Sequence, residues 1–464
     1  MVMGGRREKT KRLLRGQGRG AKRRGNANFR RTGETSGNER KMIGQNKGAR
    51  PANLRRSNER ALLGLLMRLG VASRSDLAKA SGMSQPTAGK ITAELMKLGI
   101  VQEIEEPVSG PNGRPGESAP LGRPGRMLCL NRDQPRFLGI ELDVEETRVA
   151  ALPIAPTAEQ SWSIVFATPS HPEAWQKRLR QELKKFPHQD LWGALVSVPG
   201  IVDEKNGQVL YSPNLHWSEG ARLPDLIREV CGLPVLLVQE IRALALGHLA
   251  AHPECDGFLL VDFGYGVGGA IVEGGKLYSS PLPLHGELGH TPVPGNQRIC
   301  GCGARGCVET LLSRPGMLAS FAAAHPDQPR TFAALAGQIR SQGLEAWLIE
   351  SLDTLSSIIA GALNVLGLRQ VVLTGCLNEL PPAVTQRLAD GIQRGALWAR
   401  FGQVTCELAP RRRAIGLAAV GLDRLVVPSG HQPGWRGRDL GHSRKNAASR
   451  ARRSRLPAAR QKLS

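Results

Sequence analysis

Three of the eight cysteines in this 464-residue chain are crowded into the stretch RICGCGARGCVET, residues 298–310. They are Cys300, Cys302 and Cys307, and His290 precedes the first of them by ten residues. Three thiolates and one imidazole make the closed tetrahedral donor set of a structural zinc site, and the intervening glycines let the backbone fold tightly around a metal. We therefore predict a Zn²⁺ ion that stabilises the loop and does not activate water. Free or redox-active thiols are the alternative.

Two glutamates flank the predicted zinc ligands. Glu287 precedes His290 in LPLHGELGH, and Glu309 follows Cys307 by two residues. Carboxylate oxygens accept hydrogen bonds from hydroxyl groups, so a loop fixed by zinc would present both side chains to a polyhydroxylated ligand. Solvated surface carboxylates are the alternative.

A glycine-rich turn interrupts two apolar runs in VDFGYGVGGAIVEGGKLY, residues 261–278. The second run reads as a strand and no helical pattern follows the turn, so the segment does not meet the context of a dinucleotide-binding fingerprint. A tight hairpin and a turn that cradles phosphate are both compatible with it.

From residue 53 to about residue 130 the pattern is compact and helical, and then it changes. NERALLGLLMRLG spaces its leucines, among them Leu69, at helical intervals up to Gly70, and SRSDLAKAS follows as a short second helix capped by a serine. A longer third helix, with Leu98 among its apolar positions, starts after Gly82, with Ser84 as N-cap and a proline in its first turn. This succession is typical of a helix-turn-helix.

The start of the third helix carries side chains suited to DNA. Ser84, Gln85, Thr87 and Lys90 combine small hydrogen-bonding groups with one cation, which fits base edges and phosphates in a major groove. A three-helix bundle that binds another protein is the alternative.

A strand, a loop and a returning strand are predicted after Val101. The loop repeats GRPG at 113–116 and 122–125, which holds Arg114 and Arg123 extended for insertion into a narrow minor groove. A polar interdomain linker is the alternative. We predict a winged helix-turn-helix DNA-binding domain over residues 51–132.

Residues 133–427 alternate short apolar strands with long helical patterns, which indicates an α/β domain with internal lobes. The two flanking tails lack apolar periodicity, so we expect residues 1–50 and 428–464 to be disordered. Lys and Arg outnumber Asp and Glu by 16 to 3 in the first tail and by 10 to 1 in the second, which leaves the domains between them almost neutral although the formal net charge is +23. The tails would attract phosphate backbones non-specifically; solvated sequence, or a true start at Met42, is the alternative.

The sequence lacks a run of 18 apolar residues and the apolar core of a signal peptide at its N-terminus. We therefore expect a cytoplasmic, nucleoid-associated protein with reduced thiols and no membrane partner.

Three motifs resemble the ROK family, named for repressors, open reading frames and sugar kinases. GHTPVPGNQRICGCGARGCVE resembles its zinc signature, HGELGH its sugar-side motif, and SVPGIVDEKNGQVLYSPNLHW the segment that ends in a sugar-contacting Asn. The resemblance covers roughly residues 53–425 and implies a two-lobed, actin-like (ribonuclease H-like) ATPase fold for residues 133–427. With the N-terminal helices it implies the repressor branch, whose members form homodimers or homotetramers and release operator DNA when sugar binds.

Site residues follow from the resemblance. His290, Cys300, Cys302 and Cys307 match the zinc ligands. In the family that the chain resembles, certain positions hold the hydroxyl groups of the sugar. The residues at the matching positions here are Asn214, Glu287, Glu309 and, beside the metal, His290.

Two departures bear on catalysis and on the ligand. Glu240 falls where the family's kinases have their catalytic Asp, so its carboxylate is one methylene further from the backbone, which costs orders of magnitude in a geometry-limited transfer. Gln239 takes the place of the neighbouring Asn. Arg242 replaces a later Asn, where it favours either an anionic ligand or a salt bridge to a nearby Glu.

The first phosphate loop is also altered. Family kinases have D-x-G-G-T after their first strand, whereas this chain has GIELDVEETRVA, with Asp143, Val144, Glu145 and Glu146 in the loop. Carboxylates repel phosphate and offer it no donors, so we predict that the protein is not an enzyme.

The predicted function is a DNA-binding transcriptional repressor of sugar-metabolism genes, in which a degenerate sugar-kinase-like domain retains Glu240 in a pocket for a sugar or sugar phosphate. An active ATP-dependent sugar kinase with a helical appendage is the main alternative. A ligand-independent architectural DNA binder is a third.

Overall fold

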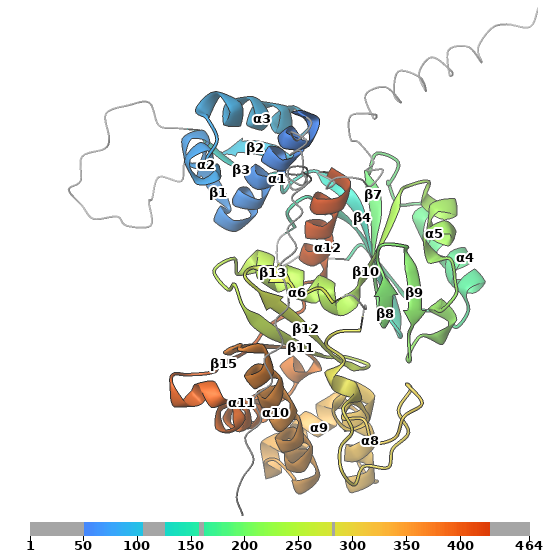
Figure 1. Cartoon of the computed structure of the whole chain (residues 1–464). Coiled ribbons are helices and arrows are strands. Elements are labelled where there is room, and N and C mark those ends of the chain that lie inside the picture. Colours follow the sequence, from blue (N-terminus) through green and yellow to red (C-terminus); the bar gives the residue numbers. More distant parts are fainter. Residues whose placement is uncertain (1–50, 105–125, 157–161, 281–283, 427–464) are drawn as a thin grey trace, which may run out of the picture. The chain divides into compact units, whose positions relative to one another are not determined.

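The computed structural model describes residues 51–104, 126–156, 162–280 and 284–426 (Figure 1). Both predicted tails lie outside the described residues, as do Arg114 and Arg123 of the predicted wing.

Three helices and a small sheet form the first part of the described chain. The sheet is antiparallel, with the order β1-β3-β2, so the expected strand and returning strand are confirmed as β2 and β3. The elements are α1 (Pro51–Leu69), β1 (Val71–Ser73), α2 (Arg74–Ser81), α3 (Gln85–Lys97), β2 (Val101–Ile104) and β3 (Met127–Leu130).

Local capping explains where α2 and α3 begin. Ser73 caps α2 in a capping box with Asp76, and Gly82 ends that helix in the left-handed conformation, at φ 67°. Ser84 caps α3, as the sequence predicts. Leu69 and Leu98, which continue the apolar spacing in the sequence, are exposed because each stands at a helix end where the buried stripe has already stopped.

Lobe 1 is built on a five-stranded sheet of order β10-β7-β4-β5-β6, in which β5 is antiparallel to its neighbours. Strands β4, β7 and β10 are parallel, and β7 is buried along its whole length. The strands are β4 (Pro135–Leu142), β5 (Glu146–Pro153), β6 (Ile164–Ala167), β7 (Gly193–Val198) and β10 (Val235–Gln239). Its other elements are α4 (Pro172–Leu183), the hairpin β8 (Ile201–Asp203) and β9 (Gln208–Tyr211), η1 (His216–Ser218) and α5 (Leu223–Cys231).

Lobe 2 repeats this topology. Its sheet has the order β13-β12-β11-β14-β15, again with the second strand antiparallel to a central first strand and the last two strands parallel to it. The strands are β11 (Phe258–Phe263), β12 (Val267–Glu273), β13 (Lys276–Leu277), β14 (Gln370–Gly375) and β15 (Thr405–Leu408). The helical elements are η2 (Leu288–His290), α7 (Glu309–Leu312), α8 (Arg314–Ala324), α9 (Phe332–Gln342), α10 (Ala346–Leu366), η3 (Cys376–Glu379), α11 (Pro382–Gly395) and η4 (Leu397–Arg400). Two lobes of one topology are the architecture that the resemblance implies.

Two helices link the lobes, α6 (Glu240–Ala251) and α12 (Arg413–Gly421), the second continuing as a π-helix (Leu422–Val426). They pack on each other; α12 also contacts β4 and β7, while α6 contacts β10 of lobe 1 and β12 of lobe 2. Gly247 of α6 and Gly416 of α12 face the partner helix's backbone so closely that a Cβ on either would clash with a carbonyl group. The close crossing therefore requires glycine on both helices.

One described helix, α10, is long and apolar enough to span a bilayer by length and composition alone. Its buried side chains, including Leu352, Leu355 and Ile359, belong to the core of lobe 2, where α10 packs against α11.

Candidate metal centre and ligand cleft

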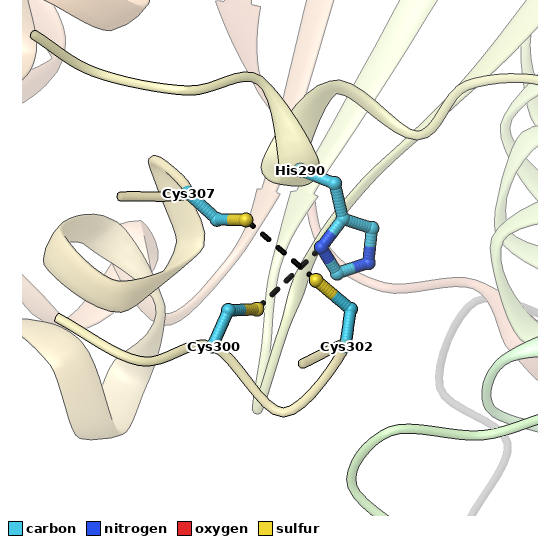
Figure 2. Close-up of side chains that lie close together, drawn as sticks. All are labelled: His290, Cys300, Cys302 and Cys307. Carbon is cyan, nitrogen blue, oxygen red and sulfur yellow. Dashed lines mark hydrogen bonds between the residues drawn. The ribbon is translucent and has the colours of Figure 1, made fainter. Parts of the chain in front are cut away.

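The four predicted zinc ligands converge (Figure 2). Cys300 Sγ lies 3.6 Å from His290 Nδ1, Cys302 Sγ lies 3.7 Å from Cys307 Sγ, and all four ligand atoms lie within 4.8 Å of one another. Zinc–ligand bonds of about 2.0–2.3 Å place tetrahedral donors about 3.5–3.8 Å apart, so the donor set fits Zn²⁺ in type and in spacing.

The backbone of this loop is closed on itself. Cys300 N donates to Ala304 O at 2.8 Å, and Gly303 N donates to Cys300 O at 2.9 Å. Gly303 and Gly306 both have φ 82°, a conformation that favours glycine. Burial raises the pKa of the Cys300 and Cys307 thiols, so a bound cation is what would hold them as thiolates at neutral pH.

Glu309 connects the metal loop to the glycine-rich turn. Its Oε2 accepts a hydrogen bond from Val267 N at 3.0 Å, and its Oε1 lies 3.5 Å from Cys300 Sγ. A Cβ at Gly266 would lie 2.5 Å from Glu309 Oε2, so this glycine makes room for the carboxylate. The turn joins β11 to β12 in a hairpin, as the sequence allows.

Glu287 stands beside the metal ligand His290. Its Oε2 lies 3.7 Å from His290 Nε2, the ring nitrogen that does not face the thiols. Burial raises the pKa of the Glu287 carboxyl, the positive charge of a protonated His290 opposes the rise and the negative charge of Glu309 adds to it. A carboxylate next to the second nitrogen of a metal-bound imidazole orients that ligand.

A cleft between the two lobes brings the candidate ligand-binding residues together. Asn214, Glu240, Glu287, His290 and Glu309 all line it. Tyr211 at the end of β9 also lines the cleft, and its hydroxyl donates to Gly301 O of the metal loop at 3.3 Å. The metal loop is thus tied to lobe 1 across the cleft.

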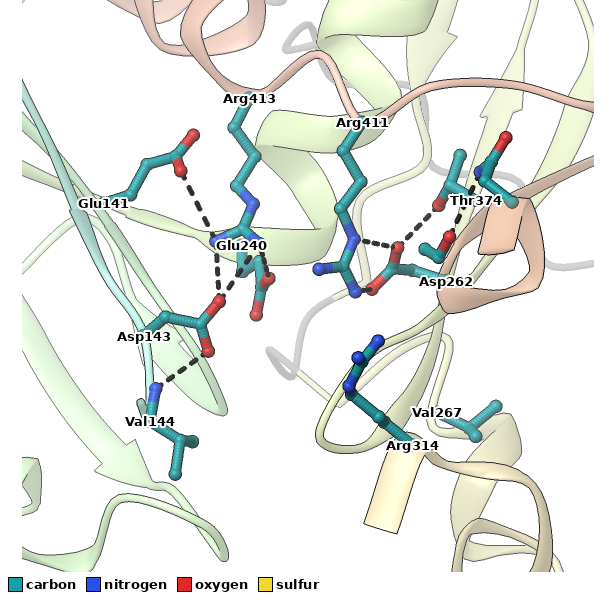
Figure 3. Close-up of polar contacts among 12 residues, drawn as sticks. Glu141, Asp143, Val144, Glu240, Asp262, Val267, Arg314, Thr374, Arg411 and Arg413 are labelled. Carbon is teal, nitrogen blue, oxygen red and sulfur yellow. Dashed lines mark hydrogen bonds and ion pairs between the residues drawn. The ribbon is translucent and has the colours of Figure 1, made fainter. Parts of the chain in front are cut away.

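Glu240 is neutralised by a guanidinium (Figure 3). Arg413, at the start of α12, has a side chain only 2% exposed, and one terminal nitrogen lies 3.0 Å from Glu240 Oε1. Both terminal nitrogens lie 3.1 Å from Asp143 Oδ2, and one lies 3.9 Å from Glu141 Oε2. Glu240, which the resemblance places where family kinases are expected to have a catalytic Asp, is therefore engaged by the protein's own cation.

A second guanidinium binds the wall of lobe 2. Arg411 donates to both carboxylate oxygens of Asp262, at 2.8 and 2.7 Å, and Thr374 donates to the same carboxylate at 2.7 Å. A Cβ at Gly264 would lie 2.6 Å from Arg411 Nη2, so Arg411 covers the glycine-rich turn. Among the described cleft-lining residues, Arg411 is the only Lys or Arg.

The loop that the sequence predicts to be an altered phosphate loop is the turn between β4 and β5. Asp143 accepts a hydrogen bond from Val144 N at 2.8 Å, so its carboxylate uses a donor that would otherwise face a ligand. Glu145 accepts from the Tyr265 hydroxyl of lobe 2 at 3.2 Å. Arg413 and the other charges around it hold the pKa of Asp143 low against the effect of burial.

Arg242 does not line the cleft. Its Nε donates to Glu204 Oε1 at 3.1 Å, and Glu204 also binds Arg424 and the backbone N–H of Gln239. Of the two roles that the sequence leaves open for Arg242, the structure has the salt bridge.

The four predicted DNA-contacting side chains on α3 are exposed together at its N-terminal end, at Ser84, Gln85, Thr87 and Lys90. The Ser84 and Thr87 hydroxyls lie 2.8 Å apart, so part of their hydrogen-bonding capacity caps the helix.

Sequence reasoning did not find Arg411, Arg413, Asp262 or Glu141. The signal was present in APRRRA, three consecutive arginines between a strand and an apolar helix. Arginine at such a boundary is normally solvated, and only the fold shows that both lobes bring carboxylates to it.

Comparison with known proteins settles the family. A family model described as ROK family matches residues 146–422. The chain belongs to the ROK family. A xylose repressor of Caldicellulosiruptor bescii is 26% identical over 276 residues, which span 57% of this chain and 66% of that repressor's length. The repressor Mlc of Escherichia coli K12 is 23% identical over 390 residues, covering 79% and 92% of the two chains.

The fold has a solved counterpart within the ROK family. A crystal structure of a ROK family transcriptional regulator, a homologue of E. coli Mlc, superposes with a TM-score of 0.62 at 20% identity, over 80% of this chain and 97% of that one. The match shows a shared fold over the part of the chain that it covers, while the site residues are argued from the geometry above.

Proposed function

We propose that this ROK protein is a DNA-binding transcriptional repressor of sugar-metabolism genes, in which residues 51–132 form a winged helix-turn-helix and residues 133–427 a sensor for a sugar. The observation that carries the proposal is the exposed polar face at the start of α3, on a helix that follows a short capped helix and a left-handed glycine. The matches to Mlc and to the Caldicellulosiruptor repressor support it. The protein would act in the cytoplasm, at the nucleoid.

The metal loop supports sensing and not catalysis. Zn²⁺ held by His290 and the three cysteines would occupy a closed donor set, with no position left for a reacting water. Its role would be to fix Glu309 and His290 in the cleft, where Glu309 and Glu287 would accept hydrogen bonds from ligand hydroxyls and the Nε2–H of His290 would donate one.

The sensor would not phosphorylate its ligand. A general base must be free to take a proton from the attacking hydroxyl, whereas Glu240 is paired with Arg413 at 3.0 Å. An ATP-dependent sugar kinase remains the competing function because the two-lobed fold and the sugar-side motif serve kinases equally well.

Sugar binding between the lobes would favour one lobe arrangement over another and lower operator affinity through that difference. In a homodimer or homotetramer two helix-turn-helix units would read a two-fold symmetric operator, and the separation between them would change with the lobes.

Two measurements on the full chain test this function. Selection of genomic fragments bound at physiological salt should enrich a small set of sites, and Gln85→Ala should lose that enrichment. A coupled assay of ATP consumption over a panel of sugars should show no turnover. Failure to enrich any fragment, or turnover that disappears in Glu240→Ala, would contradict the proposal.

A further inference from the structure

The segment that crosses from lobe 2 to lobe 1 is short and carries both cleft arginines. It leaves β15 at Leu408 and enters α12 at Arg413, so residues 409–412 alone make the crossing. Ala409 N donates to Leu373 O in the lobe 2 sheet at 2.8 Å, whereas α12 packs on β4 and β7 of lobe 1. A change in lobe separation must be absorbed near this segment and at α6, the other connection between the lobes.

The two arginines form ion pairs with carboxylates of opposite lobes (Figure 3). Arg411 holds Asp262, the fifth residue of β11 in lobe 2, through a bidentate pair. Arg413 holds Asp143 and Glu240 of lobe 1. Paired guanidinium–carboxylate contacts of this kind are directional as well as charge-assisted, so they fix the angle of the chain between them.

The cluster holds more carboxylates than guanidinium groups. Four carboxylates, at Glu141, Asp143, Glu240 and Asp262, face two guanidinium groups, and the Arg413 side chain is almost completely buried. Removal of one partner from a buried charged cluster leaves charges that neither water nor protein compensates. Arg413 is the critical member because it contacts three of the four carboxylates, of which Glu141 also lies 3.6 Å from Arg148 Nη1.

Three carboxylates of the cluster, together with Arg411, also line the cleft. Asp143, Glu240 and Asp262 line the cleft, whereas Arg413 stands behind them. A ligand hydroxyl group that donates to Glu240 would compete with Arg413 for that carboxylate. The competition would alter the contacts of Arg413, which is the first residue of α12.

We propose that Arg411 and Arg413 form a built-in ionic clamp that fixes the crossing segment to both lobes, and that Glu240 is the positioning residue through which a ligand in the cleft acts on the clamp. The clamp places a cation from within the chain beside Asp143 of the altered loop. This inference concerns the sensor domain alone and holds whether or not the first domain binds DNA.

Hydrogen–deuterium exchange of the full chain, followed by mass spectrometry, tests the clamp without any ligand. Arg413→Gln should raise exchange in peptides covering residues 408–416 by at least about tenfold, because a buried charged pair has lost one partner. Arg387→Gln is the matched control, since it removes a bidentate partner of Asp353 between α10 and α11. It should leave residues 408–416 unchanged.

A pH series separates a charge clamp from simple packing. In Arg413→Gln, an ionised Glu240 would repel the carboxylates of Glu141 and Asp143 beside it. It would also repel Asp262 across the cleft, although Asp262 is paired with Arg411. Arg413 lowers the pKa of Glu240, so its loss moves ionisation above about pH 7, and exchange at 408–416, corrected for the intrinsic rate, should rise as the pH increases beyond that value. The double variant Arg413→Gln with Glu240→Gln should remove most of that rise.

The proposal is overturned if Arg413→Gln retains wild-type exchange at 408–416, or if its loosening is independent of pH and Glu240→Gln does not reduce it. Should Arg413→Gln fail to fold, Asp143→Asn replaces it, because Asp143 receives both terminal nitrogens of Arg413. Asp143→Asn should raise exchange at 408–416 several-fold, and an unchanged rate there would equally overturn the clamp.

Discussion

Glu309 accepts a hydrogen bond from the backbone of Val267 at 3.0 Å, which ties the metal loop to the hairpin turn at the floor of the cleft. The other oxygen of the same carboxylate faces Cys300 Sγ at 3.5 Å. The position of one ligand-facing side chain thus depends on the metal loop on one side and on the β11–β12 hairpin on the other.

Zinc content is the first prediction. The purified protein should contain about one zinc per chain, as the four-donor site requires, and Cys302→Ser should lose it together with several degrees of Tm. Cys255→Ser changes a cysteine outside the loop and is the control; it should keep both the zinc and the wild-type Tm. Full zinc occupancy in Cys302→Ser would refute the site; atomic absorption and thermal unfolding make the measurement.

The charge of the cleft predicts which sugars bind. Its described lining holds five carboxylates and one arginine, already paired with Asp262, so neutral sugars should bind and their phosphate esters should not. Thermal-shift titration of matched pairs, such as xylose, glucose and their phosphates, measures this. Stabilisation by a phosphate ester and not by its parent sugar would contradict it.

Glu240 predicts a pH dependence of stability. Burial raises its pKa from 4.5 to about 7, with Arg413 opposing the rise and Asp143 adding to it. A group whose pKa is higher in the folded state stabilises the fold fully at low pH, and that contribution is lost as pH rises from about 4.5 to about 7. Across this window the unfolding free energy of Glu240→Gln should therefore decline less than that of the wild-type protein. The difference between the two declines should be on the order of 2 kcal/mol. Urea unfolding at several pH values checks the slope, and parallel curves for the two proteins would exclude the assignment.

Two exposed lysines on α3 allow a controlled test of which end of the helix contacts DNA. Lys90 stands near the N-terminal end of the exposed face and Lys97 in the last turn, and both are exposed. Lys90→Ala should weaken binding to a selected fragment by about tenfold. It should also reduce the slope of log affinity against log salt concentration by the amount expected for about one phosphate contact. Lys97→Ala should change neither, and equal losses in the two variants would place the DNA elsewhere.

The sequence predicted the parts of this molecule that local chemistry determines. Ser84 and Gly82 mark helix ends because capping is a local interaction, and the cysteine spacing brings Cys300, Cys302 and Cys307 together within one closed loop. The duplicated sheet topology followed from the family resemblance and not from periodicity, which does not distinguish the order of strands.

The clamp was beyond prediction because its members are far apart in the chain. Arg413 meets Asp143 across 270 residues and Arg411 meets Asp262 across 149. Neither spacing nor composition reports such pairings. The altered loop around Asp143 predicted a loss of phosphate binding, but the cation that balances it is visible only in the folded chain.

The most direct test of a cleft that controls DNA binding is a mobility-shift titration of a selected genomic fragment, with and without the neutral sugars that stabilise the protein. At least one such sugar should lower the affinity of the wild-type chain for the fragment about tenfold or more, the scale of an allosteric coupling of 1–3 kcal/mol. Glu309→Gln, which keeps an acceptor for Val267 N but loses the charge, should bind the fragment normally and respond weakly. DNA affinity that no stabilising sugar alters, or an undiminished response in Glu309→Gln, would contradict the account.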